Sequence, residues 1–395
     1  MQMKSIALAT LALAALAAPV QAQETIKIGI ILSYSGQFAD AATQMDNAIK
    51  LFVKENGDTV AGKKLEFIRK DTGGVAPDVA KRLAQELVVR DKVDILAGFA
   101  LTPNAMAAGD ISSEAKKFMV VMNAATSIIT TKSPFMARTS VTIPQLQEPF
   151  GAWARKSGKL SKVYTMVSDY GPGHDAEQAF SRGFKEAGGE VVGSVRMPVA
   201  NPDFSAFVQR AKDLNPEAIF VFIPGGAQPA AFAKALQSRG IDPKKTKILG
   251  QGEITMDDNV LQGMGESAVG IVTAFHYDHS HKSAKNEKFV KAFNAAYGRN
   301  PDVFSIGGWD GMHLIYETLK KTGGKADGDS LIGAAKGMKW ESPRGPISID
   351  PATRDIVQNV YIRRVEKKGG KLVNVEVDKV PNVKDPVKEA MKKKK

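Results

Sequence analysis

The residues from Ile26 to Leu32 read IKIGIIL, and this run establishes the fold class of the chain. Nearly all of its side chains are apolar and most are β-branched, which is typical of a strand buried on both faces of a parallel sheet. The residues that follow change to a helical period, with one apolar face made by Met45, Ile49, Phe52 and Val53. A buried strand followed by an amphipathic helix is the repeating unit of an α/β protein.

The same alternation of strand and helix continues along the chain in two blocks that meet near Arg138. The first block has predicted strands at 26–32, 64–69, 93–97 and 118–122, and helices over 45–53, from Pro77 and from about Asn104. The second has strands at 162–168, 190–195, 218–223 and 247–249, and helices at 175–187, 204–214 and 229–238. Such alternation implies parallel sheets covered by helices. We therefore predict an α/β fold of two lobes, each a mostly parallel sheet.

The remainder of the chain does not form a third block. It holds a predicted strand at 269–275, helices at 282–297 and 305–321, and β segments at 347–350 and 360–365. We expect the chain to return to the first lobe and then to the second. This assigns 23–141 and 275–346 to an N-terminal lobe and 142–274 and 347–395 to a C-terminal lobe, with a basic tail at 392–395. The crossings, near 139–143, 272–275 and 346–349, would form a multi-strand hinge.

The first 22 residues have the pattern of a secretory signal peptide. Lys4 supplies the positive start, residues 6–18 are apolar, and Val20-Gln21-Ala22 suits cleavage after Ala22. The apolar run is shorter than the ~20 residues that span a bilayer, and Pro19 interrupts it. We therefore expect a mature chain that is exported to the periplasm.

The composition excludes several classes of chemistry. The chain has 395 residues, a formal charge of +12 and no cysteine, so disulfides, a thiol nucleophile and cysteine-held metals are absent, as is the cysteine that a lipoprotein anchor requires. The positive charge is compatible with nucleic acid or a membrane surface, but export argues against a nucleic-acid partner. No Gly-x-Ser-x-Gly, His-Glu-x-x-His or Walker motif is present. We expect no catalytic residues, no metal and no cofactor, and a structural or surface role for the cluster of His276, Asp278, His279 and His281.

Five short motifs resemble one known family. They are Ile28–Gly36, Ile95–Gly98 followed by Thr102, Asn123–Thr126, Ser168–Gly171 and Gly265–Ala268. In this order the chain resembles the type I periplasmic solute-binding proteins, and most of all the Leu/Ile/Val-binding group of ABC importers. The resemblance implies a small-molecule ligand bound between two lobes by hinge closure, delivery to an inner-membrane permease, and a monomer. A ligand-sensing domain for a membrane receptor and a secreted hydrolase are less favoured alternatives.

The loops after the predicted strands hold the candidate ligand-binding residues. Ligands of open α/β sheets bind outside the carboxyl ends of the strands, where helix N-termini favour an anion. By resemblance, Thr102, Ala124 and Thr126 match positions that hold the carboxylate and amino group of an amino acid, and Glu253 matches the partner of its ammonium. The full prediction is Ser35, Phe38, Thr102, Ala124, Thr126, Tyr170, Glu253 and Phe304.

The chain departs from the branched-chain amino-acid binders at the wall of this site. Ala41 aligns near a position where those proteins have an aromatic residue, and the tyrosine expected near 224–227 is absent. Phe38, Phe99 and Phe304 are available to line a different wall. A branched-chain or related amino acid is the first expectation for the ligand, and an aromatic carboxylate is the alternative.

Overall fold

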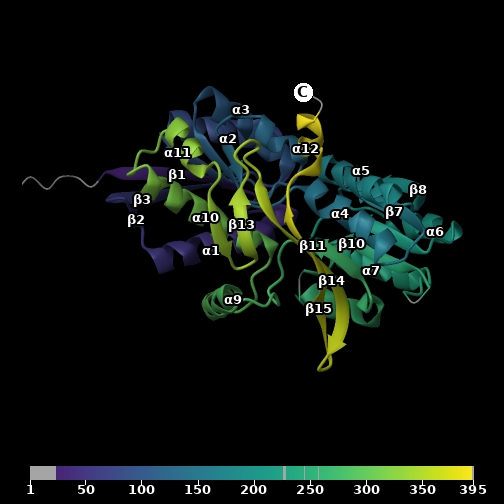
Figure 1. Ribbon diagram of the computed structural model, residues 1–395. Helices are drawn as coiled ribbons and strands as arrows, with labels where there is room; N and C mark the ends of the chain where they lie inside the picture. The colour runs from purple at the N-terminus through teal and green to yellow at the C-terminus, as the bar shows by residue number, and fades with distance from the viewer. Residues whose placement is uncertain (1–23, 226–227, 244, 257, 394–395) are drawn as a thin grey trace, which may run out of the picture.

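The computed structural model describes residues 24–225, 228–243, 245–256 and 258–393 (Figure 1). The predicted signal peptide and its cleavage after Ala22 lie outside these residues, as do the last two residues of the basic tail. Within the part described, no helix has the length and apolar character needed to cross a membrane.

The first sheet is built around the IKIGIIL strand. Its order is β2-β3-β1-β4-β5-β6, and only the pairing of β2 with β3 is antiparallel. Because β1 pairs on both sides, Ile28 and Ile30 are fully buried, as the sequence predicts. The strands are β1 (Thr25–Leu32), β2 (Thr59–Val60), β3 (Lys63–Asp71), β4 (Ile95–Gly98), β5 (Phe118–Val121) and β6 (Met136–Arg138).

Helices cover both faces of the first sheet, and three of them come from late in the sequence (Figure 1). One face carries α2 (Pro77–Val89) and α3 (Thr102–Glu114), whose Leu87 and Ala108 pack into one apolar cluster. The other carries α1 (Ala39–Asn56), packed against α10 (Val303–Lys321). The remaining late helices here are α9 (Ala284–Tyr297) and α11 (Gly328–Ala335).

The second sheet has the order β12-β13-β14-β11-β10-β9-β7-β8, with β15 paired to β14. It is parallel from β8 to β11 and antiparallel beyond. Its strands are β7 (Lys162–Ser168), β8 (Glu190–Met197), β9 (Ala218–Phe222), β10 (Lys247–Gln251), β11 (Val272–Phe275), β12 (Lys339–Ser342), β13 (Gly345–Ile349), β14 (Ile356–Lys368) and β15 (Lys371–Val383). Its helices are α4 (Ile143–Lys156), α5 (Gly171–Glu186), α6 (Phe204–Asp213), α7 (Gln228–Ser238) and α8 (Asp258–Met264).

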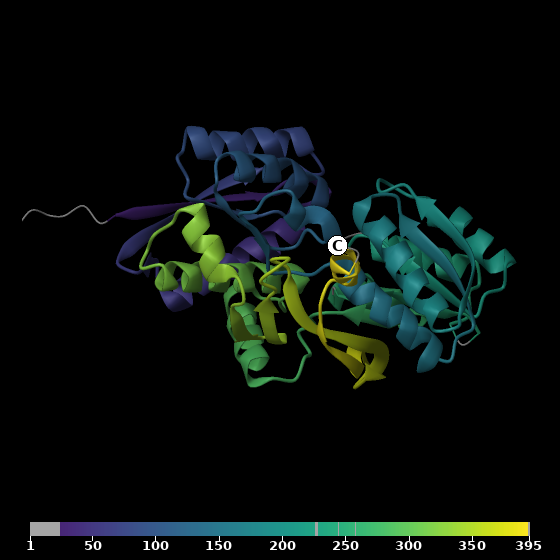
Figure 2. The ribbon, with the colours of Figure 1, turned by 45° about the horizontal axis from the view of Figure 1, so that its top comes forward.

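Short 3₁₀ turns and one last helix complete the chain. The turns are η1 (Gly36–Phe38), η2 (Ser127–Thr131), η3 (Gly252–Thr255) and η4 (Gly265–Ala268). The last helix is α12 (Pro386–Lys392), which contacts α4. Figure 2 shows α12 at the junction of the two α/β bodies, with β14 and β15 beside it.

Buried polar contacts fix the passage from the first body to the second. Residues 139–142 connect β6 to α4. The fully buried Arg344 donates to the carbonyl oxygen of Ser140 at 2.9 Å and to that of Thr139, and it pairs with Asp310 at 2.9 Å. A charged group from the β12–β13 turn therefore holds this passage in place.

Candidate functional site

A cavity opens between the two bodies, at the carboxyl ends of strands from both sheets. The first body contributes residues that follow β1, β4 and β5 and the start of α10, and the second contributes residues that follow β7, β9 and β10. This is where open α/β sheets bind ligands. The lining residues are Gln37, Phe38, Asp40, Ala41, Ala100, Leu101, Thr102, Asn123, Ala125, Ile143, Tyr170, Pro172, Phe222, Pro224, Gly225, Glu253, Met256, Asp302 and Phe304.

The structure brings five of the eight predicted residues to this cavity. They are Phe38, Thr102, Tyr170, Glu253 and Phe304. They come from separate segments of the chain and from both bodies, so the loops that the sequence indicated do converge.

The other three predicted residues lie outside the lining. Ser35 is exposed, and its N–H donates a hydrogen bond to the carboxylate of Asp71 at 3.3 Å. Ala124 is 2% exposed, beneath the wall. Thr126 is 6% exposed, and its hydroxyl is hydrogen-bonded to that of Thr102 at 3.0 Å, so it supports a lining residue from behind. Their direct contact with a ligand stays a prediction.

Phe99 does not contribute to the cavity wall. It is 1% exposed and packs into the apolar cluster under α2 and α3. The prediction that it could line the site is wrong, because its side chain lies in this cluster and not in the cavity lining. Phe222 of β9 lines the second body's wall, and its ring lies 6.2 Å from that of Tyr170.

A glycine sets the position of the tyrosine. A Cβ at Gly173 would lie 1.8 Å from the carbonyl oxygen of Ser168, so only glycine allows α5 to approach the end of β7 this closely. Tyr170 is the N-cap residue of α5, and it lies three positions before this contact in the sequence. The sequence predicted this helix to start at Asp175, but it starts at Gly171, which brings its N-terminus to the cavity.

The cavity is acidic in its ionisable groups, and its described lining residues include no Lys, Arg or His. Glu253 accepts hydrogen bonds from the N–H of Gly225 at 2.9 Å and from Gln251 Nε2 at 3.2 Å. Burial raises the pKa of Glu253 to about 7, and it also raises that of Asp302 to about 6. Burial, and then the charge of Glu253, raise the pKa of Tyr170 well above its usual value. Glu253 is therefore poised between neutral and charged forms at neutral pH.

Three helices direct their N-terminal ends at the same space. Thr102 is the first residue of α3, Pro172 lies in the first turn of α5 and Phe304 in the first turn of α10. Helix N-termini carry unpaired N–H groups and a partial positive charge, and so favour an anion without a basic side chain. At α10, however, Asp302 already accepts from the N–H groups of Phe304 and Ser305, both at 2.9 Å. The N-termini of α3 and α5 are thus the better places for a ligand anion.

Several lining residues were not predicted. Asn123 and Ala125 flank the predicted Ala124 in the same motif, and alternate side chains of that short loop face the cavity. Asp302 lies directly before α10, which starts at Val303 rather than at the predicted 305, and aspartate is a common residue at this capping position. Phe222, at the end of a fully buried strand, carries no signal that separates it from the core.

The histidine cluster has separate partners rather than a common centre. The ring of His276 packs on Phe275 at 4.9 Å, and His281 Nδ1 lies 2.8 Å from Glu376. Among the described residues no three His, Cys, Asp or Glu side chains gather as metal ligands would.

Comparison with known proteins places the chain in a family. A family model described as periplasmic binding protein matches residues 25–371. The Leu/Ile/Val-binding protein homolog 6 of Brucella melitensis biotype 1 is 43% identical over 387 residues, which cover 97% of this chain and 99% of the relative.

Solved structures of solute-binding proteins share the fold. One from an ABC transporter of Rhodopseudomonas palustris BisB5, in complex with 3,4-dihydroxybenzoic acid, is 53% identical with a TM-score of 0.88, covering 92% of this chain and 99% of that one. One from strain HaA2, in complex with p-hydroxybenzoic acid, is 43% identical with the same TM-score and the same coverage. The two sheets, the cavity between them and these matches together show that the chain belongs to the periplasmic binding protein family.

Proposed function

We propose that this protein is the solute-binding component of an ABC importer, and that its ligand is a single-ring aromatic carboxylate of the hydroxybenzoate class. The relatives at 53% and 43% identity that hold dihydroxy- and hydroxybenzoic acid support this ligand class. The proposal also matches the alternative that the sequence left open beside an aliphatic amino acid.

Two features of the cavity support the proposal most strongly. Aromatic rings line it, and its described lining residues include no basic side chain. The rings of Phe38, Tyr170, Phe222 and Phe304 come from both bodies and suit a flat ligand. The carboxylate would lie at the N-terminus of α3, beside the hydroxyl of Thr102. A ring hydroxyl would then reach Glu253 in the second body, whose protonated form tolerates an anionic ligand.

A branched-chain amino acid is the second candidate, and the acidic groups favour it. An ionised Glu253 or Asp302 would pair with a ligand ammonium. The relative named a Leu/Ile/Val-binding protein homolog supports this candidate at 43% identity. Against it stands the raised pKa of Glu253, since a site built for an ammonium gains from a carboxylate that is already charged.

The mechanism that we infer is hinge closure between two lobes. The N-terminal lobe would comprise 23–141 and 275–346, and the C-terminal lobe 142–274 and 347–395. This division gives β12 and the start of β13 to the N-terminal lobe, although both strands belong to the second sheet. A ligand that contacts both lobes favours the closed state by its higher affinity for that state. The crossings near 139–143, 272–275 and 346–349 remain the proposed hinge.

The cellular role follows from the predicted export. Signal-peptide removal after Ala22 would release a monomer into the periplasm, where the closed form would dock on an inner-membrane permease. Binding without turnover is expected, so a bound ligand should be recovered chemically unchanged.

A thermal-shift screen of the mature chain tests the ligand class. The probes are 4-hydroxybenzoate, 3,4-dihydroxybenzoate, benzoate, L-leucine and L-phenylalanine at equal concentration. A ligand at about 100 times its Kd stabilises the folded state by about 2.7 kcal/mol, so the hydroxybenzoates should raise Tm most. A larger shift with leucine would favour the amino-acid candidate. Detection of a reaction product by chromatography would contradict binding without turnover and indicate catalysis.

A further inference from the structure

A buried arginine holds the loop that forms part of the cavity wall. This loop, residues 123–127, is called the cavity loop below. Arg138, at the end of β6, is fully buried and donates from Nη1 to the carbonyl oxygens of Ala124 at 3.1 Å and Thr126 at 2.8 Å, and from Nη2 to that of Ser127 at 3.3 Å. Its remaining donors bind Asp355, at 3.0 Å from Nε and 2.6 Å from Nη2. All five N–H groups of the guanidinium are thereby used.

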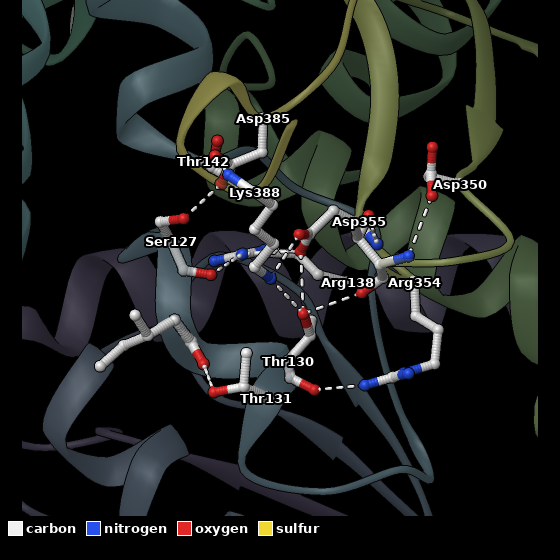
Figure 3. Close-up of polar contacts among 12 residues, drawn as sticks. Ser127, Thr130, Thr131, Arg138, Thr142, Asp350, Arg354, Asp355, Asp385 and Lys388 are labelled. Atoms are coloured by element: carbon white, nitrogen blue, oxygen red, sulfur yellow. Dashed lines mark hydrogen bonds and ion pairs between the residues drawn. The ribbon is translucent and has the colours of Figure 1, made fainter. Parts of the chain in front are cut away.

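The carboxylate that orients this arginine is shared with the C-terminal helix. Asp355 Oδ1 accepts from Arg138, and Asp355 Oδ2 lies 2.6 Å from Nζ of Lys388 in α12 (Figure 3). Lys388 also donates to the hydroxyl of Thr130 in η2, the turn that begins at the last residue of the cavity loop. Burial lowers the pKa of Lys388, although Asp355 opposes that shift. A cation from the end of the chain therefore meets the anion that orients Arg138.

A second set of contacts ties α12 to the same loop. Asp385 caps α12 by accepting from the N–H groups of Val387 and Lys388, and it also accepts from Ser127 Oγ at 2.6 Å. The N–H of Ser127 donates across the two bodies to Asp175 of α5 at 2.7 Å. Ser127 is thus where the first body, the second body and α12 meet.

The charges of the four most buried ionisable residues in this cluster balance, and the less buried Asp175 adds one more carboxylate. Arg138 and Lys388 supply two positive charges, and Asp355 and Asp385 supply two negative ones; each of the four residues is at most 6% exposed. Helix α12 also contacts α4 of the second sheet. The helix therefore lies against the second body and binds the loop of the first (Figures 2 and 3).

We propose that Lys388 of α12 is a positioning residue for the ligand site: through Asp355 and Arg138 it holds the cavity loop in the conformation that completes the wall between the two bodies. The inference rests on the proposed function only in taking the cavity as the ligand site. It goes beyond that function in making the C-terminal helix a determinant of affinity, although α12 contributes no lining residue.

Hydrogen exchange of the ligand-free protein tests the proposal without a ligand. The variant is Lys388→Met, which keeps the length of the side chain and leaves Arg138 and Asp355 as a pair. Peptides that cover residues 122–131 should exchange faster than in the wild type, while peptides of β7 and β9 should not change. The matched control is Lys392→Met on the same helix, whose side chain is 39% exposed. It should behave as the wild type, and Lys388→Arg should restore protection.

The second readout is the affinity for 4-hydroxybenzoate. Mutations in a coupling network change linked free energies enough to alter affinity by about 2- to 30-fold, so Lys388→Met should raise Kd within that range at unchanged stoichiometry. If the wild type does not bind this probe, the proposed function fails while the exchange result still decides the role of Lys388.

Unchanged exchange of the cavity loop in Lys388→Met would overturn the proposal. So would equal loosening in the Lys392 control, because it would show a general effect of disturbing α12. If Lys388→Met does not fold, Lys388→Gln replaces it, since glutamine removes the same charge at the same position but keeps a polar end group. The same comparison of residues 122–131 then applies, with the same contradicting result.

Discussion

The backbone N–H of Gly225 donates a 2.9 Å hydrogen bond to the carboxyl group of Glu253, and this bond does not keep that group ionised. The bond lowers the pKa of Glu253, but burial outweighs it and brings the pKa to about 7. The ligand cavity therefore changes charge within the physiological pH range.

The affinity for an anionic aromatic ligand should fall as pH rises through 7. An ionised Glu253 would repel the ligand carboxylate in a cavity whose described lining has no basic side chain. Linkage limits the effect of one proton to about tenfold in Kd per pH unit above 7. Titration of 4-hydroxybenzoate at pH 6 and pH 8 measures it. Glu253→Gln should flatten the profile, and an affinity that rises with pH would instead indicate an ammonium ligand.

The stability of the ligand-free protein should also depend on pH through the ionisation of Glu253. The pKa of Glu253 is higher in the folded state than in the unfolded state. Its contribution to the free energy of unfolding is therefore fully present below about pH 4.5 and is lost as the pH rises to about 7. Glu253→Gln removes this loss. Between pH 5 and pH 8 the free energy of unfolding of the variant should therefore rise relative to that of the wild type, by at most about 3 kcal/mol at about 1.36 kcal/mol per pKa unit. Urea unfolding at both values is the measurement. Glu266→Gln, at an exposed position, should show no such gain.

The bond from Ser127 to Asp175 should strengthen the closed arrangement of the two bodies. Asp175→Ala leaves the buried N–H of Ser127 without its acceptor. Hydrogen bonds to charged groups contribute about 1.5–3 kcal/mol, so 4-hydroxybenzoate should bind at least about tenfold more weakly. Glu186→Ala, an exposed change on the same helix, is the control. Equal affinities of the two variants would contradict a role for this contact in binding.

Asp355 should matter for stability as well as for binding. Asp355→Asn leaves Arg138 and Lys388 buried without their shared anion. Removing one partner of a buried ion pair typically costs about 3–5 kcal/mol. Chemical denaturation should show a loss of that size, and Asp355→Asn combined with Lys388→Met should recover part of it. Additive losses in the double variant would show that the two residues do not share one charge network.

The regular strands and helices were largely predictable because their periods are local properties of the sequence. The strand at 26–32 and the helix from Pro77 appear where apolar spacing placed them. Helix α4 was missed because Pro144 and Pro149 suggest interruption, yet Pro144 lies in its first turn and a capping box from Thr142 starts the helix. Strand β15 was missed because its outer side chains are polar and mostly exposed.

The site was predictable only as far as it lies at the ends of predicted strands. Thr102 and Glu253 follow such strands, and both line the cavity. The contacts of Arg138 with Asp355 and of Ser127 with Asp385 join residues 217 and 258 positions apart. No local pattern encodes such pairs, because they arise only when β14 and α12 return to the first body.

Titration calorimetry of the mature chain at pH 7 with 4-hydroxybenzoate, followed by L-leucine, tests the central claim most directly. A cavity lined by four aromatic rings, with a Glu253 that is about half protonated at this pH, should bind one hydroxybenzoate per chain. Its Kd should be at least about 100 times lower than that for leucine, a difference of about 2.7 kcal/mol. Tighter binding of leucine, or no heat from 4-hydroxybenzoate with a folded protein, would contradict the account.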